Sequence, residues 1–349
     1  MNDAPLSVWD YERLAEAKLD PGAHGYYAGG AGDESTLRDN VAAYRRRYLR
    51  PRMLVDVETC TTETTVLGQR IDLPVLVAPV AFQRVAHPDG EVAMARAAYA
   101  AGTIMCLSTL ATSTPAEVAE VGGPRWFQLY VLRDEGITFD LIAQARDSGF
   151  SALVLTIDAP VRGIRERDWR SGFAIPADLR IASLGRGGLT PMQVFEQISP
   201  SLTWRDLERI AGEAGLPLLV KGVLTAEDAN LACEHGAAGI VVSNHGGRQL
   251  DGVAATIDAL PEVVAAVDDR VEVLVDGGIR RGTDVVKALA LGARAVLAGR
   301  APLWGLAVDG EDGARDVLRI LQGETLNALQ LTGCVSPAAV GRDRVAPLP

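Results

Sequence analysis

The chain has few cysteines, few aromatic residues and no long hydrophobic run. Its 349 residues include 4 cysteines, and aromatic residues make up 5%. Because so few scattered thiols provide neither a disulfide framework nor metal-ligand spacing, we expect reduced cysteines and no bound metal. No apolar stretch reaches the ~18 residues that cross a bilayer, and residues 1–10 lack the features of a signal peptide. We therefore expect a cytoplasmic protein that has no membrane partner.

Positive charge is also scarce. The chain has 34 Lys and Arg against 45 Asp and Glu, which gives a formal net charge of −11. Such a surface argues against nucleic acid as a partner, and it gives no long-range attraction for an anionic substrate. Any site for an anion must therefore be built locally. The hydrophobic content of 48% is enough for a large core.

Short apolar runs rich in Val, Ile and Leu alternate with helix-like segments. Eight runs predict strands over 75–79, 103–107, 126–130, 152–157, 217–221, 239–243, 272–276 and 294–299. Segments between them, such as 90–101, 137–148, 226–235 and 283–291, carry apolar residues three and four apart. This α/β pattern predicts a parallel sheet, and eight such units closing on themselves form a TIM (β/α)8 barrel. A doubly wound open sheet is the alternative, but no Gly-x-Gly-x-x-Gly follows the first strand.

Two segments fall outside this repeat. Residues 1–70 form a helical and irregular lead-in that could cap the barrel or contribute side chains to its mouth. The connection from 158 to 203, after the fourth strand, is predicted to be a long exposed loop. We expect a single domain over residues 1–349, with the lead-in at 1–70 and the barrel at 71–349.

Polar residues gather where the predicted strands end, which is where barrel enzymes place their active sites. The clearest case is the run from Ser243 to Arg248, which follows a buried strand. It places the imidazole of His245 and the guanidinium of Arg248 three residues apart, with two glycines that allow a tight turn. A base beside an anion clamp predicts chemistry on a substrate that bears a carboxylate.

The turns after the seventh and eighth predicted strands suggest a phosphate site. Glycines that allow close backbone approach and arginines that supply charge occur in both turns: Asp276, Gly277, Gly278 and Arg280 in the first, Gly299 and Arg300 in the second. Barrels commonly bind a phosphate at these two turns, through backbone N–H groups and the start of a helix.

These motifs together resemble the FMN-dependent 2-hydroxy-acid oxidases and dehydrogenases, which include enzymes that oxidise glycolate, lactate and mandelate. The matching segments cover nearly the whole chain, at 26–31, 50–52, 78–79, 86–88, 127–130, 220–222, 243–251, 276–278 and 299–300. The resemblance implies a TIM barrel, an FMN cofactor, a small 2-hydroxy acid as substrate and a homotetramer.

The resemblance also implies residues that bind the substrate. Arg165 and Arg248 would hold its carboxylate, because a planar guanidinium matches the two carboxylate oxygens. Tyr26 and Tyr130 would form hydrogen bonds with the carboxylate and the hydroxyl group.

His245 would be the catalytic base, with Asp158 orienting its imidazole. It would remove either the hydroxyl proton, as hydride passes to the flavin, or the proton on the α-carbon. The sequence leaves both routes open.

The remaining implied residues bind FMN. Lys221 would lie near the N1 and O2 edge of the flavin ring and stabilise its reduced anion. Pro79, Val80, Ala81, Ser108, Gln128, Thr156 and Ser243 would surround the ring, and Asp276, Gly277, Gly278, Arg280, Gly299 and Arg300 would bind the ribityl and phosphate end.

Departures from the family pattern bear on specificity. Glycolate-oxidising members carry a tryptophan where this chain has Leu110, so we expect space for an aromatic substrate such as mandelate or 4-hydroxymandelate. Phe82 and Leu110 would pack against its ring. Val80 replaces a frequent hydroxyl residue, whereas Ala81 resembles the oxidases. The last feature favours O2 as the electron acceptor, with H2O2 as product, and the family implies the (S) configuration.

Three alternatives remain open. The first is a 2-hydroxy-acid dehydrogenase that uses another acceptor or a small aliphatic substrate such as lactate or glycolate. The second is an aldolase in which Lys221 forms a Schiff base. The third is a flavin-binding protein without catalysis, although such a protein would need no base.

Overall fold

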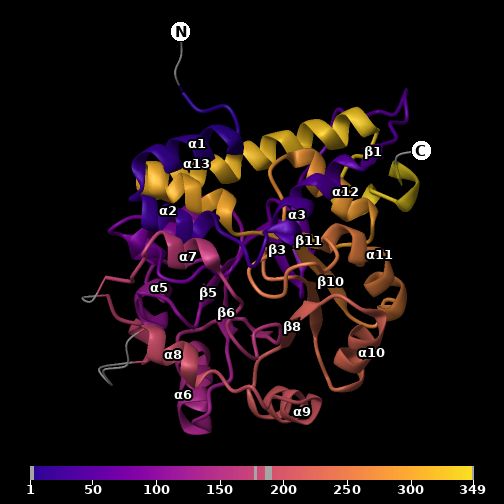
Figure 1. Cartoon of the computed structure of the whole chain (residues 1–349). Coiled ribbons are helices and arrows are strands. Elements are labelled where there is room, and N and C mark those ends of the chain that lie inside the picture. Colours follow the sequence, from indigo (N-terminus) through magenta and orange to yellow (C-terminus); the bar gives the residue numbers. More distant parts are fainter. Residues whose placement is uncertain (1–3, 177–178, 185–190, 348–349) are drawn as a thin grey trace.

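The eight predicted strands form a closed parallel barrel (Figure 1). A computed structural model describes residues 4–176, 179–184 and 191–347. Around the barrel the strands follow the order β10-β11-β4-β5-β6-β7-β8-β9, so the TIM barrel is confirmed and the open sheet is wrong. Their bounds lie within two residues of those predicted: β4 (Val75–Val77), β5 (Met105–Ser108), β6 (Arg125–Leu129), β7 (Ala152–Thr156), β8 (Leu218–Val223), β9 (Gly239–Val242), β10 (Glu272–Asp276) and β11 (Ala295–Ala298).

Helices connect the strands on the outside of the barrel. The apolar spacing predicted four of them within two residues, because their buried faces pack on the strands. The outer helices are α4 (Gly90–Ala100), α5 (Pro115–Ala119), α6 (Glu135–Asp147), α9 (Trp204–Glu213), α10 (Ala226–Glu234), α11 (Thr256–Val267), α12 (Gly282–Ala290) and α13 (Arg300–Thr332), the last broken at Asp309 and Gly310.

Alternation along the strands divides the apolar residues into two cores. Side chains on successive strand residues point to opposite faces, so Cys106 on β5 faces the barrel interior while Met105 and Leu107 pack under the helices. The interior core also contains Leu76, Trp126, Ala152, Val154, Leu219, Val241, Leu274 and Leu297. On each strand, the inward side chain that follows the last apolar residue of the interior core lies at the carboxyl end of the barrel.

A hairpin from the lead-in closes the amino end of the barrel. It consists of β2 (Thr64–Val66) and β3 (Gln69–Ile71), which pair in antiparallel fashion. Val66 and Ile71 are buried in the interior core. The backbone N–H of Leu67 donates to the carboxylate of Glu272, the first residue of β10, at 2.8 Å. The amino end is therefore filled with side chains, and the carboxyl end is left for function.

Other parts of the lead-in reach the carboxyl end. They form α1 (Val8–Lys18), α2 (Pro21–Ala28) and α3 (Ser35–Arg45), and α1 lies along α13 at the top of Figure 1. The short strand β1 (Arg47–Leu49) pairs with β12 (Val345–Pro347), which joins the lead-in to the C-terminal segment. The lead-in thus contributes both to closing the barrel and to its mouth.

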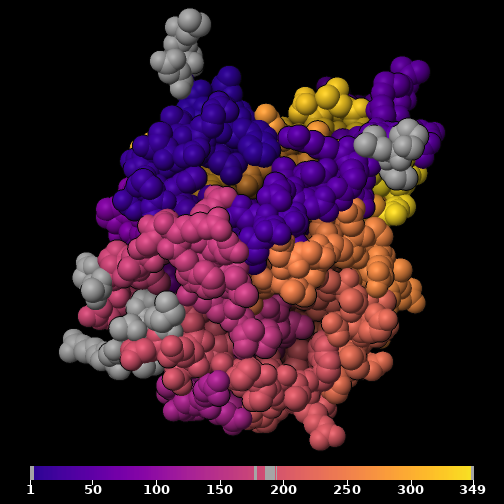
Figure 2. Space-filling model, in the orientation of Figure 1, coloured from indigo at the N-terminus to yellow at the C-terminus, as the bar shows by residue number. Residues whose placement is uncertain are grey.

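The long connection after β7 contains two short α-helices in its described part, with the 3-10 helix η2 (Ala182–Leu184) between them. The α-helices are α7 (Glu166–Arg170) and α8 (Pro191–Gln197). Arg167 on α7 forms an ion pair with Glu34, so this connection lies against the lead-in, as pink and indigo surfaces meet in Figure 2. In the part of the chain that the structure describes, no helix combines the length and apolar character needed to span a membrane.

Candidate active site

A cavity opens at the carboxyl ends of the strands, where the inward positions become polar. Its volume is about 1030 Å³, including the part open to solvent. Two residues beyond the interior apolar positions, alternation places Ser108, Gln128, Thr156, Lys221, Ser243 and Asp276 at this end. The predicted site residues line the cavity except Asp158, Ser243 and Phe82. Asp158 and Ser243 contact His245 and Lys221 from behind.

His245 sits on a strained turn directly after β9. Its φ is +60°, in the left-handed region that costs a residue other than glycine about 1–3 kcal/mol. The backbone N–H of His245 donates to Ser243 Oγ at 3.0 Å. Backbone strain of this kind persists only where surrounding contacts hold it, and here the turn directs the imidazole into the cavity.

The imidazole bridges a carboxylate and a phenol. Its Nδ1 lies 2.7 Å from Asp158 Oδ1, and its Nε2 lies 3.5 Å from the hydroxyl of Tyr130. Gly222 makes this approach possible, because a Cβ at that position would lie 2.8 Å from the Cβ of Asp158. With Nδ1 donating its hydrogen to the Asp158 carboxylate, Nε2 is the free base that faces the cavity.

The pKa values of His245 and Asp158 are both lowered, which suits a base and the carboxylate that orients it. Burial lowers the pKa of His245, and the nearby Lys221 and Arg165 lower it further, against the opposing effect of Asp158. Burial opposes ionisation of Asp158, but the attraction and hydrogen bond of His245, with Lys221, hold the Asp158 pKa below its ordinary value. At neutral pH the site therefore holds a carboxylate and a neutral imidazole.

Arg165 and Arg248 lie beside one another in the cavity lining, and Arg248 contacts Tyr26. Arg248 Nη1 donates to the backbone oxygens of Tyr26 and Gly29 at 2.6 and 2.9 Å, and its guanidinium lies 5.0 Å from the centre of the Tyr26 ring. Arg165 is 5% exposed and donates from Nε to the Arg248 carbonyl at 3.2 Å. Burial, followed by repulsion from Arg248, lowers the pKa of Arg165 to about 10.

Arg300, the first residue of α13, adds a third guanidinium. It donates to the backbone oxygens of Tyr27, Gly29 and Gly246 at 2.8 to 3.0 Å. Burial, with repulsion from Arg248 and Arg280, lowers the pKa of Arg300 well below its ordinary value. Among the described residues, no ion pair joins Arg165, Arg248 or Arg300 to a carboxylate: Asp168, whose charge acts on Arg165, pairs with Arg162, and Glu12, whose charge acts on Arg300, pairs with Arg280. This concentration of unneutralised positive charge makes the cavity an anion site in a protein of net negative charge.

Lys221 is held as a cation deeper in the cavity. Its Nζ donates to Ser243 Oγ at 2.8 Å and lies 3.1 Å from Asp276 Oδ2. Burial opposes the charge, but Asp276 and Asp158 outweigh it and raise the pKa of Lys221. A Schiff-base lysine must be neutral to attack a carbonyl group, so these contacts argue against the aldolase alternative.

The phosphate end has arginines, a helix start and the predicted glycines, and one of these glycines is also required by packing outside the cavity. The α13 N-terminus, at Gly299 and Arg300, lines the cavity together with Arg280, which is partly neutralised by Glu12 at 3.1 Å. A Cβ on Gly278 would lie 2.0 Å from the Asn40 carbonyl oxygen. Gly278 is therefore required where α3 packs on the turn, while the opposite side of the turn lines the cavity.

The prediction that Phe82 lines the substrate pocket is wrong. Phe82 is fully buried behind the wall, with its ring centre 6.3 Å from that of Tyr26 and 6.4 Å from that of Phe195. Phe195 on α8 lines the cavity instead, as Leu110 does. Sequence reasoning also missed Tyr27, Ala78, Gly246, Ile279, Leu297, Ala298 and Leu303 in the lining. Tyr27 and Gly246 adjoin predicted site residues, whereas Phe195 belongs to a segment without a periodic pattern.

The chemical groups of the cavity fit FMN. Two buried atoms in its lining, Gln128 Nε2 and Asp276 Oδ1, have no hydrogen-bond partner in the described structure, as expected of groups that bind a polar ring or a ribityl chain. The cation Lys221 lies beside Asp276, and the α13 N-terminus with Arg280 and Arg300 supplies a place for a phosphate.

Comparisons with known proteins agree with this geometry. The chain is 51% identical to L-lactate oxidase from Nostoc sp., covering 95% of each chain, and 45% identical to human 2-hydroxyacid oxidase 1, covering 97% of this chain and 96% of the relative. Among solved structures, mandelate oxidase superposes with a TM-score of 0.93 at 46% identity, covering 98% of each chain. Residues 15–347 match the FMN-dependent dehydrogenase family. The chain therefore belongs to this family, as an FMN-dependent enzyme that oxidises 2-hydroxy acids.

Proposed function

We propose that the enzyme oxidises an aromatic (S)-2-hydroxy acid, such as mandelate or 4-hydroxymandelate, to the 2-oxo acid, and that O2 is the acceptor and yields H2O2. The observation that carries the proposal is the pair of arginines, Arg165 and Arg248, beside the neutral imidazole of His245. An anion clamp and a base in one cavity fit a substrate whose carboxylate and hydroxyl group are on the same carbon.

Each side chain has a distinct part in the reaction. Arg165 and Arg248 bind the carboxylate, which fixes the α-carbon and hydroxyl group near Tyr130 and His245. His245 Nε2 takes a proton from the substrate, and Asp158 stabilises the resulting imidazolium through Nδ1. FMN, when bound, supplies the two-electron acceptor. Lys221 supplies positive charge at the inner end of the cavity, where it would stabilise negative charge on the reduced flavin ring.

The aromatic substrate is supported by the cavity wall. Leu110 and Phe195 line the cavity and offer apolar surface for a ring, with Val80 on the same lining. The solved structures similar to this chain include mandelate oxidase with benzoyl-formic acid and a mandelate oxidase variant with (S)-mandelic acid, at TM-scores of 0.91 and 0.92. Ala81, which also lines the cavity, supports O2 as acceptor through its resemblance to the oxidases.

A small aliphatic substrate is the second candidate. It is favoured by the 51% identity to L-lactate oxidase and the 47% identity to spinach glycolate oxidase. Arginines that bind a carboxylate and a base suit lactate as well as mandelate. The apolar side chains of Leu110 and Phe195 therefore have to discriminate between the two substrates.

Anaerobic flavin reduction tests the function. The yellow protein mixed with (S)-mandelate, (S)-4-hydroxymandelate, L-lactate and glycolate should lose its flavin absorbance, fastest with the aromatic acids, and should form peroxide once air is admitted. (R)-Mandelate is the matched control. Faster reduction by lactate or glycolate would refute the aromatic preference, no reduction by any acid would refute the function, and reoxidation without peroxide would refute O2 as a two-electron acceptor.

His245→Ala tests the base. The variant should retain FMN but be reduced by mandelate at least ~100-fold more slowly, because general base catalysis contributes about 10²–10⁴-fold. In the wild type, kcat/KM should rise with pH as His245 loses its proton. Burial lowers that pKa, so the rise should be centred below about pH 6.5. Wild-type reduction rates in the variant would remove His245 from this role.

Leu110→Trp tests the pocket. The larger indole should occupy the space for the phenyl ring and lower kcat/KM for mandelate by about 10-fold or more relative to glycolate, since steric differences in a pocket are worth roughly 1–3 kcal/mol. Leu110→Met, of similar volume, is the control and should keep the preference. An unchanged mandelate to glycolate ratio in the tryptophan variant contradicts the proposed wall.

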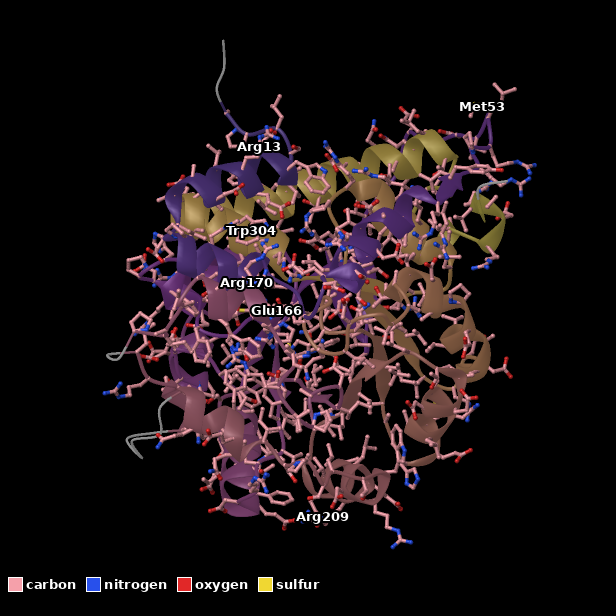
Figure 3. The ribbon with its side chains drawn as sticks, in the orientation of Figure 1. Arg13, Met53, Glu166, Arg170, Arg209 and Trp304 are labelled. Atoms are coloured by element: carbon pink, nitrogen blue, oxygen red, sulfur yellow. The ribbon has the colours of Figure 1, made fainter. Side chains whose placement is uncertain are left out.

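We also propose that the enzyme is a homotetramer. Met53 and Leu54 project from the segment between β1 and β2 with 69% and 106% relative exposure, and Figure 3 shows Met53 pointing away from the body of the molecule. Leu54 holds a left-handed backbone with φ of +60°. Exposed apolar side chains on a strained turn suit an interface. Light scattering should give about four times the 37.0 kDa chain mass, and a monomer mass would refute the proposal.

A further inference from the structure

Two buried asparagines from distant parts of the chain form a reciprocal pair next to the base. Asn40 on α3 and Asn244 after β9 are 2% and 4% exposed. Asn40 Nδ2 donates to Asn244 Oδ1 at 2.8 Å, and Asn244 Nδ2 donates to Asn40 Oδ1 at 2.9 Å. Two reciprocal hydrogen bonds fix the relative orientation of both amides as well as their distance.

The pair holds the turn that carries His245. Asn244 Oδ1 also accepts from the backbone N–H of Gly247 at 3.1 Å, and Asn244 Nδ2 donates to the Ala254 carbonyl at 3.1 Å. The turn from 244 to 247 is thus bound on both sides of His245, whose left-handed backbone needs such support.

Asn40 also contacts the neighbouring turn after β10. Its Oδ1 accepts from the backbone N–H of Thr256 at 3.2 Å, and the Thr256 hydroxyl donates to the carbonyl of Asp276. The backbone oxygen of Asn40 occupies the space beside Gly278, where a Cβ would approach it to 2.0 Å. One residue of the lead-in therefore contacts the base turn and the turn that lines the phosphate end.

We propose that Asn40 is a positioning residue, which holds the His245 turn and the turn from Asp276 to Gly278 at a fixed separation through its amide pair with Asn244. Asn40 lines no part of the cavity, so it acts through the backbone of these turns. The inference rests on the proposed function, because it concerns proton removal by His245. It also assigns a task to the lead-in beyond covering the barrel.

The expected size of the effect follows from geometry. A displacement of about 1 Å at a reacting group can cost roughly 100-fold in rate. Removing the Asn40 side chain takes away the two hydrogen bonds that tie the buried Asn244 amide to α3 and leaves only those to Gly247 and Ala254, so the turn can relax from its strained conformation. We expect the loss in the rate of flavin reduction, while the arginines that bind the carboxylate stay in place.

The experiment is a double-mutant cycle with saturating FMN, in which anaerobic reduction by (S)-mandelate is followed well below the melting temperature. N40A and N244A should each lower the limiting reduction rate by about 10- to 100-fold, with mandelate affinity changed by less than about twofold. The double variant should match N244A within about twofold, because both changes remove one interaction. The control is R38A, an exposed residue on α3, which should reduce at the wild-type rate.

The outcomes separate this inference from the proposed function. If wild-type protein is not reduced by any 2-hydroxy acid, the proposed function fails. If the wild type and N40A are reduced at the same rate, even with a lower melting temperature for N40A, Asn40 is only structural and the inference is overturned. Losses of N40A and N244A that add up in the double variant would also overturn it. If N40A does not fold, N40S and N244A are compared with the wild type in its place. Failure of all three variants to fold would also overturn a positioning role.

Discussion

The structure depends on the placement of three guanidinium groups in one cavity, none of which forms an ion pair with a carboxylate in the described part of the chain. Buried or half-buried cations that donate only to backbone oxygens are costly unless an anion completes the site. Two anionic groups, a substrate carboxylate and a cofactor phosphate, would satisfy that requirement at the two ends of the cavity. Because the protein as a whole is negatively charged, the attraction for these anions comes from the arginines of the cavity.

The barrel and its lead-in divide the work of building this cavity. Strand alternation presents Gln128, Lys221 and Asp276 inward at one end, and the hairpin around Val66 and Ile71 fills the other end with apolar side chains. The lead-in adds what strands cannot supply, since the backbone oxygens of residues 26 to 29 accept from Arg248 and Arg300. The arginines of the cavity are therefore held where the lead-in reaches the carboxyl ends of the strands.

Much of this arrangement could be predicted from the sequence. A period of two for strands and 3.6 for helices is a local signal, so the eight strands and the residues at their ends were found. The family resemblance assigned roles to Arg165 and Tyr26, which no periodicity could indicate. Phe82 was misplaced because its orientation depends on a left-handed backbone, φ +56°, which no sequence pattern reveals. Phe195 was missed because it is on a long connection, and the packing of Asn40 on Gly278 is a contact between distant segments. A cytoplasmic location stays a prediction.

The central claim is that Arg165 and Arg248 recognise the carboxylate of a 2-hydroxy acid. Its most direct test compares anaerobic flavin reduction by (S)-mandelate and by its methyl ester, which keeps the hydroxyl group, the α-hydrogen and the ring but has no negative charge. Hydrogen bonds to a charged group are worth about 1.5–3 kcal/mol each, so the account predicts that the ester reduces the flavin at least roughly 100-fold less efficiently. Equal efficiency of acid and ester would contradict it.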